Sequence, residues 1–114
     1  MGMQIIALTP DFAVSPQLMA EDFAWVSTQG FKTLVNNRPD GEGGDAQPTS
    51  QMLEAAARAA GLHYVYLPVV SGAITAQQVQ TLHDVLAIAP GPTLAFCRSG
   101  ARSAQLFGLA QQMG

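Results

Sequence analysis

Residues Thr93 to Ser103 read TLAFCRSGARS and combine three local signals in one short stretch. The apolar run Thr93–Phe96 predicts a fully buried strand, because it carries no polar side chain that would need water beyond its first residue. Cys97 stands where this strand ends, and a loop of small residues leads from it into a helix predicted over Arg102–Gln112. A strand, a tight loop and a helix in this order are typical of an α/β domain with parallel strands.

Short apolar runs and helical patterns alternate along the rest of the chain. The predicted elements are a hairpin over Gln4–Leu8 and Asp11–Val14, a helix over Leu18–Gln29, a strand over Phe31–Asn36, a helix over Thr49–Ala60, a strand over His63–Leu67 and a helix that begins at Thr75 and ends before Pro90. Thr75 and Gln78 have the spacing of a capping box. We therefore expect a three-layer α/β fold, with a mostly parallel central sheet flanked by helices.

Length and composition fit one globular domain over residues 1–114, either complete or cut from a longer protein. The five Lys and Arg residues are scattered and the net charge is −3, which argues against a nucleic-acid partner. The single cysteine forms no internal disulfide. The apolar run Ile5–Leu8 is too short for a signal peptide or a membrane span, so we expect a cytoplasmic protein without a membrane partner.

Three predicted strands end at polar or reactive residues. These ends are Asn37-Arg38, the turn Pro68–Ser71, and Cys97. In open α/β sheets, ligands bind outside the carboxyl ends of the strands. One site is therefore predicted to collect residues from three separate stretches, close to the long polar loop Asn37–Pro48, whose length points to a function.

The residues around Cys97 suit an activated nucleophile in an anion-binding loop. The backbone N–H groups of the loop can form an anion nest that Gly100 makes conformationally accessible, and the next helix adds its positive N-terminus. Arg102 can hold two oxygens of a tetrahedral anion. Such surroundings lower a thiol pKa from about 8.5 to roughly 3.5–7.5. We predict Cys97 and Arg102 as catalytic. The candidate anion-binding residues are Arg98, Ser99, Gly100, Ala101 and Ser103, with the Arg98 side chain toward solvent. The alternative is an inert buried thiol.

Three motifs, CRSGARS from Cys97, NNRPDGEGGDAQP from Asn36 and LPVVSG from Leu67, resemble the beta-lactamase-hydrolase-like, protein-phosphatase-like domain family over nearly the whole chain. The resemblance implies a fold similar to that of dual-specificity phosphatases. It implies a phosphatase or a sulfurtransferase, in some members fused to a persulfide dioxygenase.

Departures from the phosphatase pattern favour sulfur transfer. Four residues separate Cys97 from Arg102, where tyrosine phosphatases have five, and Phe96 stands where they carry histidine. The turn Val69–Gly72 has no acid to protonate a leaving oxygen. The main prediction is a rhodanese-like sulfurtransferase that carries a persulfide on Cys97, with thiosulfate or a persulfide as donor and a fused or separate persulfide-handling enzyme as partner. The alternatives are a phosphatase acting on a phosphate ester through a phosphocysteine, with Asp40 or water as proton source, and a silent module that binds anions or proteins.

The remaining polar residues have weaker claims. Arg38 and Asp40 are possible auxiliary residues beside the site, whereas Glu42 and Asp45 are interpreted as solvated loop side chains. Asn36 and Asn37 are expected to hold the shape of the site. His63 and His83 are isolated, and no cluster has metal-ligand spacing, so neither a metal nor another cofactor is predicted.

Overall fold

Five strands form the central sheet of the computed structural model, which describes residues 4–113. The strand order is β1 (Ile6–Thr9), β2 (Phe12–Ser15), β5 (Thr93–Phe96), β3 (Thr33–Asn36) and β4 (His63–Tyr66). β1 pairs antiparallel with β2, and the pairs β2–β5, β5–β3 and β3–β4 are parallel. The predicted opening hairpin and the mostly parallel sheet are confirmed.

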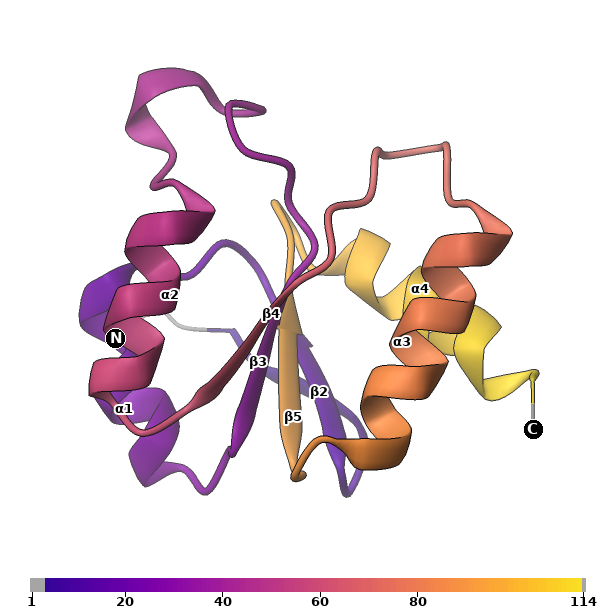
Figure 1. Ribbon diagram of the computed structural model, residues 1–114, viewed down its shortest axis with the longest axis horizontal. Coiled ribbons are helices and arrows are strands. Elements are labelled where there is room, and N and C mark those ends of the chain that lie inside the picture. Colours follow the sequence, from indigo (N-terminus) through magenta and orange to yellow (C-terminus); the bar gives the residue numbers. More distant parts are fainter. Residues whose placement is uncertain (1–3, 114) are drawn as a thin grey trace.

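Helices cover both faces of this sheet, as predicted. α1 (Phe23–Thr28) and α2 (Ser50–Ala59) lie on one face, and α3 (Ala76–Ile88) and α4 (Ala101–Gln111) lie on the other (Figure 1). Two short 3₁₀ turns, η1 (Ala20–Asp22) and η2 (Gly44–Ala46), complete the described elements. Among residues 4–113 no helix has both the length and the apolar character needed to cross a membrane.

The side chains of β5 show why the sheet needs a layer of helices on each face. Leu94 and Phe96 are fully buried in one apolar cluster, which contains Leu53 of α2. Ala95 points the other way, into a second cluster that contains Leu106 and Phe107 of α4. Successive strand residues face opposite sides of a sheet, so an apolar run in the central strand requires two cores.

The first helix is shorter than predicted. Instead of one helix from Leu18 to Gln29, a 3₁₀ turn precedes α1, which begins at Phe23. The Asp22 carboxylate accepts the backbone N–H of Met19 at 2.8 Å, and this contact closes a tight first turn. Leu18 still lies in the core, at 1% exposure, so its apolar character reflects burial rather than helix. The predicted capping box of α3 is present, since Thr75 and Gln78 exchange hydrogen bonds of 2.8 and 3.1 Å.

Candidate active site

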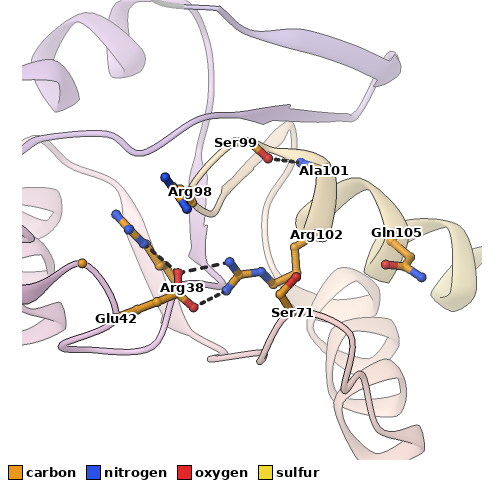
Figure 2. A pocket seen from close by; sticks show the side chains of 9 residues that line it. Arg38, Glu42, Ser71, Arg98, Ser99, Ala101, Arg102 and Gln105 are labelled. Atoms are coloured by element: carbon orange, nitrogen blue, oxygen red, sulfur yellow. Dashed lines mark hydrogen bonds and ion pairs between the residues drawn. The ribbon is translucent and has the colours of Figure 1, made fainter.

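A pocket of about 970 Å³ opens at the carboxyl ends of the parallel strands. It is lined by Arg38, Glu42, Gly43, Ser71, Arg98, Ser99, Ala101, Arg102 and Gln105 (Figure 2). These residues follow β3, β4 and β5, so the three strand ends meet in one place. The parallel register explains this arrangement, because all three strands point their carboxyl ends toward the same edge of the sheet.

Cys97 lies beneath the loop that connects β5 to α4. It is 1% exposed, and its Sγ accepts the backbone N–H of Gly100 at 3.1 Å. Gly100 has φ +97°, a left-handed conformation that side chains other than hydrogen disfavour. A Cβ at Gly100 would also lie 3.3 Å from the backbone carbonyl of Ser15. The tight curl therefore needs glycine at this position for both reasons.

The surroundings of the sulfur favour the thiolate. Burial raises the pKa of the Cys97 thiol, but hydrogen bonds from Ser103, Gly100 and Ser99 outweigh burial and leave this pKa lowered. The N-terminus of the 11-residue helix α4 points into the same loop and adds its partial positive charge. Cys97 is thus chemically distinct from an inert core thiol, which burial alone would keep protonated.

Asn37 holds the three strand ends together. Its backbone N–H donates to the carbonyl of Phe96 at 2.8 Å, and its Nδ2 donates to the carbonyl of Leu67 at 2.9 Å. Its Oδ1 accepts the Ser103 hydroxyl at 2.8 Å. All of these groups lie in the interior, where an unpaired polar atom is costly. The structural role that the sequence suggested for Asn37 agrees with these contacts, and Ser103 is held within the same network.

Arg102 is anchored over the loop by two partners. Its Nη1 donates to Glu42 Oε2 at 2.9 Å and to the carbonyl of Val69 at 2.8 Å, and its Nη2 donates to Glu42 Oε1 at 3.1 Å. Its Nε is buried and has no hydrogen-bond partner among the described residues. The guanidinium is therefore fixed in orientation and keeps two of its five N–H groups, one on Nε and one on Nη2, without a hydrogen bond to any part of residues 4–113.

Glu42 is a component of the site that the sequence reading missed. Glu42 is exposed, as expected for a loop side chain, but it is also paired, because it bridges Arg102 and Arg38, whose Nε lies 2.9 Å from Glu42 Oε1. The hydrogen bond from Arg102 is the main cause that lowers the pKa of Glu42, against the raising effect of burial. The only local signal was the four-residue spacing between Arg38 and Glu42, since Arg102 lies 60 residues away.

The polar loop that carries Glu42 is built from internal hydrogen bonds. Gln47 accepts the Gly43 N–H at 2.6 Å and donates to the Pro39 carbonyl at 2.9 Å. Asp40 does not line the pocket: its Oδ1 accepts the Ser50 N–H of α2 at 2.8 Å, and its own N–H donates to Tyr66. The structure thus brings Arg38 to the site and gives Asp40 the task of holding the loop against α2 and β4.

The remaining loop residues Arg98, Ser99 and Ala101 line the pocket. Ser99 Oγ accepts the Ala101 N–H at 3.3 Å, which steadies the turn before α4. The Arg98 side chain is exposed, as expected, yet it also lines the pocket beside Arg38 and Glu42 (Figure 2). The backbone carbonyl of Arg98 accepts the Gln17 N–H at 3.3 Å.

Residues 4–113 contain no group of three or more His, Cys, Asp or Glu side chains placed to hold a metal ion.

A buried cysteine below a glycine loop, followed by a helix N-terminus and an anchored arginine on a mostly parallel sheet, defines a cysteine-dependent, phosphatase-like domain. The chain belongs to the family described as beta-lactamase hydrolase-like protein, phosphatase-like domain, whose model matches residues 4–114. The resemblance inferred from the three sequence motifs is confirmed.

Known proteins are similar to this chain in sequence and in fold. A beta-lactamase hydrolase-like protein of Agrobacterium fabrum is 34% identical over 111 residues, which cover 97% of this chain and 26% of that protein. The chain therefore spans about a quarter of the length of this relative. A candidate phosphatase of Neisseria meningitidis superimposes with a TM-score of 0.84 and 32% identity over 91% of this chain and 73% of that chain. The core catalytic domain of a PP-IP phosphatase from S. cerevisiae, solved with citrate, has a TM-score of 0.73 and 15% identity over 96% and 65% of the two chains; that likeness shows the fold alone.

These relatives bear on the choice between a phosphatase and a sulfurtransferase. The family and the solved structures are described as phosphatases or phosphatase-like, which supports the alternative reading better than the sulfurtransferase that the sequence favoured. The prediction of sulfur transfer rested largely on the four-residue spacing between Cys97 and Arg102. That spacing is compatible with a phosphatase-like family, so it does not exclude phosphoryl transfer.

Proposed function

We propose that residues 1–114 form one phosphatase domain that transfers a phosphoryl group to Cys97 and then hydrolyses the phosphocysteine. The observation that carries this proposal is the Gly100 N–H directed at the Cys97 sulfur at 3.1 Å, inside a loop that lowers the pKa of the thiol. A thiolate is the nucleophilic form of cysteine, and an anion-binding loop around it presents an anionic substrate to the same atom.

Each group around the pocket has a task in this reaction. The loop from Arg98 to Arg102 offers backbone N–H groups to the oxygens of the phosphoryl group, and the N-terminus of α4 stabilises their charge. The Nε of Arg102, which has no hydrogen-bond partner within residues 4–113, supplies a further donor. Glu42 keeps the Arg102 guanidinium in place rather than touching the reacting atoms. Catalysis of phosphoryl transfer depends mainly on such positioning and charge stabilisation.

Sulfur transfer remains a second candidate on one specific observation. The loop between Cys97 and Arg102 is one residue shorter than that of tyrosine phosphatases, as in rhodanese-like loops. Sulfur transfer would use the same thiolate and the same arginine. In both cases a reduced Cys97 is required, which fits a reducing compartment such as the cytoplasm.

Parallel assays on one preparation decide between the candidates. The protein is incubated with 4-nitrophenyl phosphate and with thiosulfate, and phosphate release and persulfide formation are measured. Phosphate release that Cys97→Ser abolishes supports the proposal. Persulfide on Cys97 without phosphate release would establish sulfur transfer instead. His63→Gln, a change on β4 away from the pocket, serves as the matched control and should leave the dominant activity unchanged.

A further inference from the structure

Positively charged side chains outnumber carboxylates in the lining of the pocket. Three arginines line it, Arg38, Arg98 and Arg102, against a single carboxylate, Glu42. A phosphatase that expels an alkoxide needs a group that donates a proton to the leaving oxygen. Cleavage of an alkyl phosphate ester therefore requires a protonated acidic side chain in or beside the pocket.

Glu42 is not such an acid, because its carboxylate is committed to accepting hydrogen bonds. Oε2 accepts from Arg102 at 2.9 Å, and Oε1 accepts from Arg102 at 3.1 Å and from Arg38 at 2.9 Å. If Glu42 were protonated, its O–H donor would face the N–H donors of Arg102 and Arg38. Consistently, the hydrogen bond from Arg102 is the leading cause that lowers the pKa of Glu42.

Neither Asp40 nor the segment after β4 supplies the acid. Asp40 Oδ1 accepts the Ser50 N–H at the start of α2, and Asp40 does not line the pocket. The segment after β4 contributes Ser71 to the pocket, and its neighbours Val70 and Gly72 carry no ionisable group. Among the described residues that line the pocket, Glu42 is therefore the one carboxyl group, and its hydrogen bonds leave it no proton to donate.

We propose, on the basis of the phosphatase function above, that this site acts on phosphoanhydrides and acyl phosphates, whose leaving groups depart as stable anions, rather than on alkyl phosphomonoesters. In the first step the Cys97 sulfur forms a bond to phosphorus, and the phosphorus–oxygen bond breaks with its electron pair on the leaving oxygen. The protein transfers no proton in this step. Water then attacks the phosphocysteine, the thiolate leaves, and the proton released by water passes to phosphate or solvent.

The charge of the pocket suits these substrates. Carboxylate leaving groups have a pKa of about 4 and phosphate groups of about 6, whereas that of a phenol is about 10. A leaving phosphate carries charge before and after bond cleavage, and a leaving carboxylate gains its charge as the bond breaks. Arg98, exposed at the pocket mouth beside Arg38, is placed to attract it (Figure 2). A neutral alcohol would gain nothing from these cations.

A series of substrates tests the proposal through the slope of log kcat/KM against leaving-group pKa. The series is acetyl phosphate, inorganic pyrophosphate, 4-nitrophenyl phosphate, phenyl phosphate and phosphoserine. We expect kcat/KM to fall steadily along the series as the leaving-group pKa rises. The kcat/KM for phosphoserine should lie at least about 10²-fold below that for phenyl phosphate, because a general acid contributes about 10²–10⁴-fold and the described residues of this site include none. Equal kcat/KM for phenyl phosphate and phosphoserine would overturn it. Absence of turnover with every substrate would instead refute the phosphatase function itself.

Three variants show whether an acid has been overlooked. Glu42→Gln and Asp40→Asn each remove a carboxylate, and Asp45→Asn is the matched control for lost charge on the same loop. We expect Glu42→Gln to change kcat/KM by the same factor for all substrates, because it loosens Arg102 without altering proton transfer. A slope that becomes steeper in Glu42→Gln or Asp40→Asn, and not in Asp45→Asn, would identify that residue as the acid and refute the proposal.

Discussion

Replacing Arg102 by lysine separates charge from geometry at the centre of the site. Nη1 and Nη2 of the guanidinium donate hydrogen bonds to Glu42 and to the Val69 carbonyl, and Nε has no partner in the described part of the chain. Lysine retains the positive charge but has one nitrogen. It cannot hold the Glu42 carboxylate and the Val69 carbonyl and at the same time offer a fixed donor to a phosphoryl oxygen.

The size of the effect follows from the donor that is lost. Removing one preorganised donor to developing charge costs about 10²–10³ in kcat. We therefore expect Arg102→Lys to lower kcat by about 10²–10³, while the charge it keeps limits the change in KM. The fold should survive, because the lost hydrogen bond to the Val69 carbonyl contributes only about 1 kcal/mol and the Glu42 pair is partly exposed.

Steady-state kinetics with 4-nitrophenyl phosphate, together with thermal unfolding, measure both effects. Arg58→Lys is the matched control, since Arg58 lies on α2 with 72% of its side chain exposed and pairs with Glu54. It should change neither kcat nor the melting temperature. A loss of kcat in Arg102→Lys below about tenfold, or roughly 1.4 kcal/mol, would refute the role assigned to the Arg102 fork.

Two further predictions concern the thiolate and its loop. Although burial raises the pKa of Cys97, hydrogen bonds from Ser103, Gly100 and Ser99 lower it overall, so the ultraviolet absorbance of the thiolate should appear at a lower pH than that of a free thiol, with its pKa of about 8.5. The same shift means that the thiolate stabilises the fold above the unfolded-state pKa of the thiol, and that this contribution is lost as pH falls through the folded-state pKa. A thiolate absorbance transition at or above the pKa of a free thiol would contradict the lowered pKa. Gly100→Ala should cost about 1–3 kcal/mol of unfolding free energy and most of the turnover, measured by denaturant titration and kinetics, because φ is +97° and Ser15 lies 3.3 Å from the new Cβ. Gly30→Ala has the same backbone strain at φ +96° in open space, so an equal loss of stability in both variants would show that contact with Ser15 is unimportant.

The fold could be predicted from sequence because its signals are local. The apolar run ending in Phe96 identifies a strand buried on both faces, and the capping box at Thr75 marks the start of α3. Where a local signal had two meanings the prediction was less accurate. Leu18 looked like the first residue of a helix, but its burial comes from the core beneath a 3₁₀ turn.

The site could be predicted only in part, for a physical reason. Cys97, Gly100 and Arg102 lie within the short stretch from the end of β5 to the first turn of α4, so their chemistry can be inferred from a few consecutive residues. Glu42 acts through an ion pair with a residue 60 positions away, and no periodicity or spacing reports such a contact. Asp40 stood near the correct strand end, but its direction depends on the hydrogen bond to Ser50, which only the folded loop reveals.

The most direct test of the central claim is to trap the covalent intermediate. The protein is mixed with acetyl phosphate, quenched rapidly, and examined by intact and peptide mass spectrometry, with Cys97→Ser treated in parallel. We predict one added phosphoryl group on the peptide that contains Cys97, absent from the variant. A phosphoryl group found elsewhere, or equal labelling of the Cys97→Ser variant, would contradict the claim that Cys97 is the nucleophile of a phosphatase.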